Sequence, residues 1–188
     1  MSTRTLIGVI VAVATGLVVF LVVQLSSVSD RGHVRVGTSL AAAACNNASS
    51  DCLPKLTFVD TNGNAYPPEA LAGKVVVINF WATWCKPCKS EIPAFSKVFE
   101  KQQGKDLVML GVMTDDPDAT TLLNFTSDHE LVYPVVRADR DILTAFKYPE
   151  AIPTTFIYDR RGNQVHMQRG AMSEDQLSKK IEQHLAAK

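Results

Sequence analysis

The sequence has no excess of charge of either sign, because its 188 residues carry 19 Lys and Arg against 19 Asp and Glu. Proteins that bind nucleic acid electrostatically usually present a clear excess of basic residues. Nucleic acid is therefore not expected as a partner. The chain also lacks internal repeats, and its length suits one ordinary globular domain with an appendage rather than two full domains.

Histidine and cysteine are also scarce, with four of each in the chain. None of the histidines has a partner at the spacing of metal ligands. The cysteines form two pairs, Cys45 with Cys52 and Cys85 with Cys88, which together could supply four thiolates for structural zinc. Zinc pairs usually sit in tight turns, whereas Cys85 and Cys88 lie between a buried-strand pattern and a long helical pattern. We therefore expect no metal and no cofactor.

One long hydrophobic run lies near the amino terminus. The run from Leu6 to Val23 contains no charged residue and no proline, and it approaches the roughly 20 residues that a bilayer-spanning helix needs. A cleavable signal peptide has a shorter apolar region, which favours an uncleaved anchor, although residues 27–29 would serve as a cleavage site. We expect residues 1–25 to be a membrane anchor or a signal segment.

The remainder divides into a spacer and a folded domain. Residues 26–54 are rich in small and polar residues without a sustained apolar period, which predicts a flexible spacer carrying Cys45 and Cys52. Residues 55–188 should form the domain. The short tail before the apolar run suits an export signal, and paired cysteines suit an oxidising compartment. We expect a single-pass protein of the inner (cytoplasmic) membrane whose carboxyl-terminal domain lies in the periplasm or outside the cell.

The pattern in residues 55–188 predicts an α/β domain. Residues 74–81 are a nearly continuous run of β-branched and aromatic residues, typical of a strand buried on both faces. After a short hairpin around Gly63, further strands are expected at 107–113, 135–136, 154–158 and 164–168, and helices after the cysteine motif, Asp116-Pro117, Asp139 and the Ser173 capping box. This order predicts a mixed central sheet covered by helices.

The segment Trp84-Cys85-Lys86-Pro87-Cys88 lies where the buried strand gives way to a helix. Unpaired N–H groups and the positive end of the helix dipole stabilise Cys85 as a thiolate, and Lys86 adds positive charge nearby. Cys88 follows one helical turn later, close enough to close a disulfide. Cys85 is therefore the expected nucleophile, and Cys88 the less exposed resolving thiol.

These residues resemble the thioredoxin superfamily, and within it the membrane-anchored TlpA, ResA and CcmG-like reductases. The resemblance runs from Leu56 to about Leu185 and is carried by VVINFWATWCKPCKSEIP at 76–93 and IPTTFIYD at 152–159. It implies a thioredoxin-like mixed central sheet flanked by helices, with an amino-terminal hairpin. Including the expected anchor, the fold is α/β with one amino-terminal transmembrane helix.

The resemblance also assigns site residues. It implies a cis peptide bond at Pro153, next to the cysteine pair, and an Ile152 backbone that can pair with an extended substrate. Trp84, Lys86 and Pro87 are the other expected substrate-binding residues. The oxidases and isomerases of the superfamily usually carry His in the place of Pro87, so Pro87 favours a reductase.

A proton-transfer group is expected at Glu91. Thioredoxin has a buried aspartate six residues before its first cysteine, whereas this chain has Asn79, which cannot accept a proton. The ResA-like branch places a glutamate at the position of Glu91, one turn after Cys88. Burial would raise the pKa of Glu91 into the working range of a general acid or base. The alternative is a solvated helix glutamate without a chemical role.

Cys45 and Cys52 are expected to form a structural disulfide that closes a small loop in the spacer. The alternative is a second redox pair that passes electrons to Cys85, although no strand-helix junction is visible there to lower a thiol pKa.

The sequence therefore predicts a thiol-disulfide oxidoreductase that reduces disulfides of exported proteins through Cys85 and Cys88. The resemblance implies a membrane thiol donor of the DsbD or CcdA type, and apocytochrome c in cytochrome c maturation as one substrate. The alternatives are a disulfide oxidase or isomerase and a copper chaperone that uses the same two thiols.

Overall fold

The computed structural model describes Cys45 and residues 51–186. The predicted anchor at residues 1–25, and the spacer apart from Cys45 and residues 51–54, lie outside the described residues. Among the residues that are described, no helix has both the length and the apolar composition needed to cross a membrane. The membrane anchor therefore stays a prediction.

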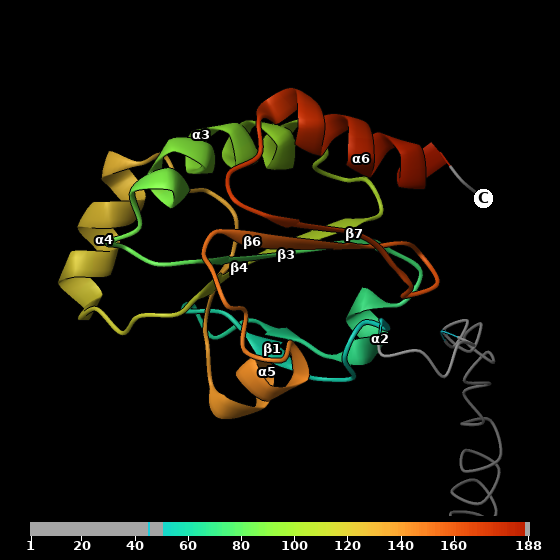
Figure 1. Ribbon diagram of the computed structural model, residues 1–188, viewed down its shortest axis with the longest axis horizontal. Helices are drawn as coiled ribbons and strands as arrows, with labels where there is room; N and C mark the ends of the chain where they lie inside the picture. The colour runs from blue at the N-terminus through green and yellow to red at the C-terminus, as the bar shows by residue number, and fades with distance from the viewer. Residues whose placement is uncertain (1–44, 46–50, 187–188) are drawn as a thin grey trace, which may run out of the picture. The chain divides into compact units, whose positions relative to one another are not determined.

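A five-stranded mixed sheet forms the centre of the domain, with the strand order β5-β4-β3-β6-β7 (Figure 1). Its strands are β3 (Val75–Trp81), β4 (Leu107–Met113), β5 (Val135–Arg137), β6 (Thr154–Tyr158) and β7 (Gln164–Arg169). The first three are parallel to one another, while β6 runs antiparallel to both β3 and β7. This is the mixed central sheet that the sequence pattern predicted.

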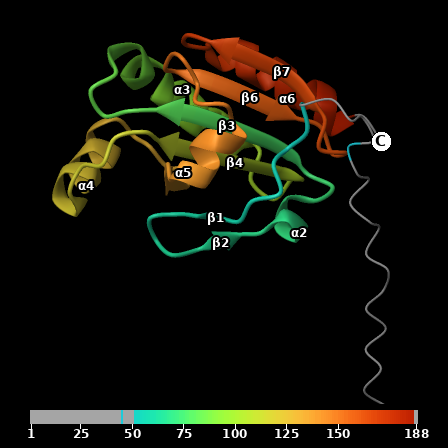
Figure 2. The same cartoon turned by 60° about the horizontal axis from the view of Figure 1, so that its bottom comes forward.

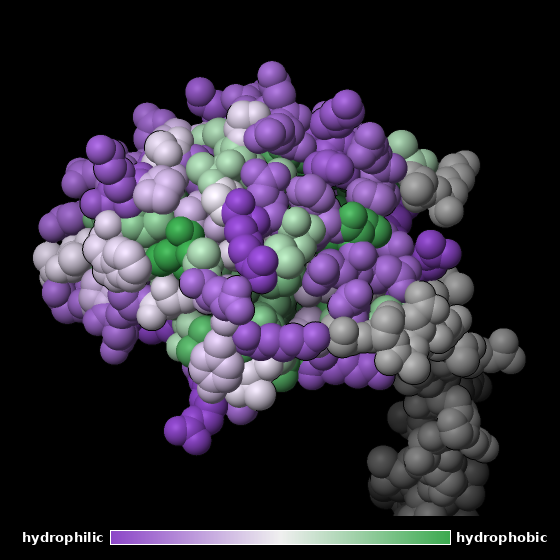
Figure 3. All heavy atoms as spheres, viewed as in Figure 1, coloured by the Kyte–Doolittle hydropathy of each residue, from purple (hydrophilic) through white to green (hydrophobic). Residues whose placement is uncertain are grey.

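Helices cover both faces of this sheet (Figures 1 and 2). One face carries α3 (Lys86–Lys101) and α6 (Glu174–Ala186), with α4 (Ala119–Asp128) beside them at one end; the other carries α2 (Pro68–Leu71), α5 (Arg140–Ala145) and the hairpin of β1 (Phe58–Val59) and β2 (Ala65–Tyr66). The thioredoxin-like arrangement and its amino-terminal hairpin are thereby confirmed. The face seen in Figure 3 is mostly hydrophilic, with apolar side chains in separate patches.

Strand β3 explains why the core has two halves. All seven of its residues are buried, and successive side chains point to opposite faces. Val77 and Trp81 pack among the residues under α3 and α6, whereas Ile78 and Phe80 pack among those under α5 and the hairpin. A strand buried on both faces reads as a continuous apolar run, so the pattern at 74–81 predicted β3 correctly.

Helix starts are mostly as predicted, with one correction. Ser173 and Gln176 form the expected capping box, each backbone N–H bonding the other side chain. The prediction that Asp116 caps the next helix is wrong, because Asp118 is the N-cap and its carboxylate accepts from the Thr121 N–H at 3.0 Å. Asp116 instead pairs with Arg137 of β5.

Candidate active site

The cysteine pair lies at the end of β3, where α3 begins. Cys85 is the N-cap of α3, and its Sγ accepts a hydrogen bond from the Cys88 N–H at 3.2 Å. The structure joins the two sulfurs in a disulfide, with the Cα atoms 5.3 Å apart. Cys85 is 3% exposed and Cys88 is fully buried. Of the two residues only Cys85 keeps any accessible surface, which favours it as the attacking thiol, and the helix N-terminus stabilises the negative charge of its thiolate.

Two contacts fix the loop that leads into the motif. The Asp115 carboxylate accepts from the Thr83 N–H at 3.1 Å and from the Thr83 hydroxyl. The Thr114 N–H donates to the Trp81 carbonyl at 2.9 Å. Residues after β4 thus hold the end of β3 and the loop that follows it, which fixes the backbone just before Cys85.

Pro153 lies at the same end of the sheet as the cysteines. It follows a cis Ile152-Pro153 bond and directly precedes β6, whose Thr154 pairs with Phe80 near the end of β3. A groove beside the motif is lined by residues from the motif, from the position after β4, from α5 and from the segment before β6: Trp84, Thr114, Leu143, Tyr148, Pro149, Glu150, Ala151 and Ile152. Trp84 and Ile152 therefore meet in one groove.

The two expected substrate-binding residues between the cysteines, Lys86 and Pro87, are exposed. Trp84 is 70% exposed, so most of its indole ring is open to a partner molecule. Sequence reasoning missed Leu143 of α5 and Tyr148 of the loop after it, because their place in the groove depends on how α5 packs beside the cysteine motif and no periodicity indicates that. The Tyr148 backbone has a positive φ of 49° and its ring is exposed, features that only the structure reveals.

Glu91 is buried behind the cysteines, with 2% of its surface exposed. Its carboxylate accepts from Asn79 Nδ2 at 2.9 Å and from the Met172 N–H at 2.8 Å. Burial raises the pKa of Glu91 to about 7, and the bonds from Met172 and Asn79 oppose that rise. The solvated alternative for Glu91 is therefore wrong.

Asn79 takes a supporting position. Its amide nitrogen donates to Glu91 and also to Thr155 Oγ1 at 3.0 Å, across the pairing of β3 with β6. Because both amide hydrogens of Asn79 are engaged in hydrogen bonds, the amide is held with its nitrogen toward Glu91. A titratable carboxylate on α3 is thus held by an amide on β3.

The second disulfide lies at the opposite end of the sheet. Cys45 is joined to Cys52, and Cys52 forms an isolated bridge with Asn163 in the turn between β6 and β7. That turn follows Tyr158, which pairs with Val76 at the start of β3, whereas Cys85 follows the end of β3. The two disulfides are therefore separated by about the length of β3, which is roughly 20 Å for seven residues.

No group of three potential metal ligands occurs among the described residues, so this part of the chain offers no assembled metal centre.

Comparison with known proteins places the chain in a family. Residues 50–167 match the model of the AhpC/TSA family. The thiol-disulfide oxidoreductase ResA of Bacillus subtilis is 34% identical over 127 residues, which cover 66% of this chain and 69% of ResA. The ResA of Geobacillus kaustophilus is 26% identical over 163 residues, or 86% of this chain and 90% of that protein.

Solved structures agree. A thiol:disulfide interchange protein of the thioredoxin family from Chlorobium tepidum superposes with a TM-score of 0.66 at 27% identity, covering 74% of this chain and 99% of that one. A secreted disulfide oxidoreductase of Mycobacterium tuberculosis, homologous to Escherichia coli DsbE, superposes at 0.60 with 26% identity, covering 69% and 96%. The chain therefore belongs to the AhpC/TSA family, as a thioredoxin-like thiol-disulfide oxidoreductase of the ResA type.

Proposed function

We propose that this protein is a membrane-tethered, extracytoplasmic reductase of disulfides in exported proteins, with the haem-site disulfide of apocytochrome c as one substrate. The observation that carries the proposal is the Cys85–Cys88 disulfide at a helix N-terminus, next to the exposed Trp84 and one turn before the buried Glu91. A protein built only for stability would not place a disulfide beside an exposed tryptophan and a carboxylate with a raised pKa.

The reaction exchanges one disulfide for another. In the reduced protein the Cys85 thiolate attacks a sulfur of the substrate disulfide, a mixed disulfide forms, and the other substrate sulfur leaves as a thiolate. Cys88 then attacks Cys85 Sγ, which releases the second substrate thiolate and restores the Cys85–Cys88 disulfide. Two electrons pass to the substrate in each cycle.

Glu91 serves the second step in this proposal. Cys88 is fully buried, so its thiol must lose a proton to a nearby group before it can attack. Glu91 lies one helical turn after Cys88, and its pKa of about 7 lets it take a proton near neutral pH. Glu91 is the assigned general base, and it returns the proton when the pair is reduced again.

The groove at Trp84 and Ile152 supplies the substrate contacts. Trp84 offers a large exposed apolar surface beside Cys85. Ile152 lines the same groove next to the cis bond, so its backbone can pair with an extended segment carrying the target cysteine. Lys86 and Pro87 border the disulfide from the helix side.

The membrane attachment is the part of the proposal that rests on the sequence. The apolar run from Leu6 to Val23 would anchor the chain, and a membrane thiol donor of the DsbD or CcdA type would reduce Cys85–Cys88 for the next cycle. The alignment with Geobacillus ResA covers 86% of this chain, so it extends into the segment before residue 51.

The reduction potential of the Cys85–Cys88 pair tests the direction of the reaction. We expect a potential near that of thioredoxin, about −270 mV, when the full chain is equilibrated in dithiothreitol buffers. The Cys45→Ser/Cys52→Ser variant, measured in parallel, isolates the signal of the active pair. A potential near that of DsbA, about −120 mV, would make the protein an oxidase and overturn the reductase assignment.

A further inference from the structure

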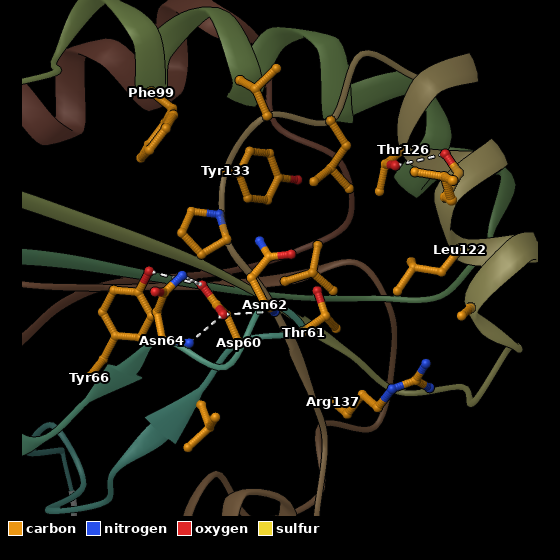
Figure 4. Close-up of a pocket in the computed structure, with 17 residues that line it drawn as sticks. Asp60, Thr61, Asn62, Asn64, Tyr66, Phe99, Leu122, Thr126, Tyr133 and Arg137 are labelled. Atoms are coloured by element: carbon orange, nitrogen blue, oxygen red, sulfur yellow. Dashed lines mark hydrogen bonds between the residues drawn. The ribbon is translucent and has the colours of Figure 1, made fainter.

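Tyr133 is a buried tyrosine whose hydroxyl has no hydrogen-bond partner among the described residues. It lies just before β5 and is 2% exposed. Buried hydroxyls are nearly always paired with protein or ordered water, and an unpaired one costs stability. In Figure 4 the Tyr133 ring lines the inner wall of a pocket, with its hydroxyl turned away from Phe99. Such a group calls for a functional explanation.

Gly111 brings Tyr133 into the vicinity of Glu91. Gly111 pairs with Asn79 between β4 and β3, and the Tyr133 ring packs directly over it. A Cβ on Gly111 would lie 2.8 Å from Tyr133 Cε2 and 2.9 Å from Trp81 Nε1, so only glycine leaves room for the ring. The ring therefore occupies the position next to Asn79, whose amide binds Glu91.

A neutral Glu91 carboxyl would lack an acceptor for its own O–H group. Both carboxylate oxygens accept from N–H donors, of Asn79 and of Met172. A neutral carboxyl also carries an O–H donor, which needs an acceptor. Two of the buried acceptors without partners lie beside Glu91, Asn79 Oδ1 and the Tyr133 hydroxyl, whereas Gln102 Oε1 lies at the far end of α3, eleven residues from Glu91. The Asn79 amide cannot turn without breaking its bonds to Glu91 and Thr155, whereas a hydroxyl hydrogen rotates freely.

We propose that Tyr133 is a positioning residue whose hydroxyl accepts a hydrogen bond from the neutral Glu91 carboxyl through one water molecule. This inference rests on the acid-base role proposed for Glu91. Tyr133 itself does not exchange a proton with the cysteines, because burial and the nearby Glu91 raise its pKa far above the physiological range. Its effect is to stabilise the protonated form of Glu91.

The surroundings of Glu91 contain few competing groups. Asn79 faces it from β3, the Met172 backbone from the segment before α6, Tyr133 from the start of β5, and Cys88 from its own helix. Within residues 51–186 no charged side chain forms a hydrogen bond or an ion pair with Glu91. The Tyr133 hydroxyl is therefore the group whose removal should be felt at Glu91.

The test is the pKa of Glu91 in Tyr133→Phe, measured by carbon NMR of labelled carboxyl groups in the full, oxidised chain. Phenylalanine keeps the ring over Gly111 and removes only the oxygen. We expect the proton affinity of Glu91 to fall about tenfold. Tyr158→Phe removes a buried tyrosine hydroxyl from the opposite face of the sheet and should leave Glu91 unchanged.

An unchanged or higher Glu91 pKa in Tyr133→Phe would overturn the assignment of Tyr133. A pKa near 4.5 in the unaltered protein would overturn both this assignment and the acid-base role of Glu91. Disulfide exchange by Cys85 and Cys88 would still stand in that case, because the reduction potential tests it separately.

Discussion

At the scale of single residues, Glu91 links the chemistry of the site to its stability. Burial of the carboxylate is the largest influence on its pKa and outweighs two good hydrogen bonds. The folded protein therefore binds a proton at Glu91 more tightly than the unfolded chain does. Ionisation of Glu91 therefore lowers the stability of the folded protein.

We predict that the free energy of unfolding falls as the pH rises from about 4.5 to about 7. The unfolded chain ionises Glu91 in this window while the folded protein does not, and the loss levels off above the folded pKa. The raised pKa of Glu91 corresponds to a loss of roughly 3 kcal/mol in the free energy of unfolding. Urea unfolding of the oxidised protein at pH 5 and pH 8 measures it.

Glu91→Gln should lose most of this pH dependence and be the more stable protein at pH 8. Glu100→Gln, an exposed position of the same helix, is the matched control and should behave as the unaltered protein does. Equal pH dependence in Glu91→Gln and the unaltered protein would contradict a buried, titrating Glu91.

The two cysteines should fail in different ways when replaced singly. Cys88→Ser retains the attacking thiol at the N-cap but cannot resolve, so it should accumulate a mixed disulfide with a disulfide-bonded protein substrate. Cys85→Ser should form none, because the remaining thiol is fully buried. Non-reducing electrophoresis and mass spectrometry distinguish the two, and equal trapping by both variants would argue against the assigned order of attack.

At the scale of elements, the sequence predicts most of what the structure contains. Nearly continuous apolar runs identify β3 and β4 because both faces of these strands are buried. The cysteine motif and Glu91 are visible because they are local to one strand-helix junction. Tyr133 could not be predicted, since its relation to Glu91 depends on pairing between distant strands. The misplaced cap at Asp116 shows that neighbouring Asp residues compete, and only tertiary contacts decide.

We predict that Gly111→Ala destabilises the domain by about 1–3 kcal/mol, because a methyl group there meets the Tyr133 and Trp81 rings. Denaturant unfolding measures the loss. Adding Tyr133→Leu should recover part of this loss, because the smaller side chain makes room for the methyl group. The double variant should therefore lose less stability than the sum of the losses of the two single variants. Strict additivity would show that Gly111 and Tyr133 do not compete for space.

At the scale of the whole molecule, the two disulfides occupy opposite ends of the sheet. Cys85–Cys88 lies where β3 ends, and Cys45–Cys52 lies at the β6–β7 turn. Thiol exchange requires direct contact of sulfur atoms, so electrons cannot pass between the pairs within this fold. The relay that the sequence left open would need a large rearrangement, whereas a structural tie between residue 45 and the sheet needs none.

We predict that Cys45→Ser/Cys52→Ser keeps its thiol-disulfide exchange activity and loses about 2.5 kcal/mol of stability, the loop-entropy value for so short a loop. Two measurements on the same preparation check this prediction: turnover of a protein disulfide reports the activity, and urea unfolding reports the stability. A relay predicts the reverse, with turnover lost and stability little changed. Because the two roles move different observables in opposite directions, one variant decides whether the second disulfide holds the chain in place or carries electrons.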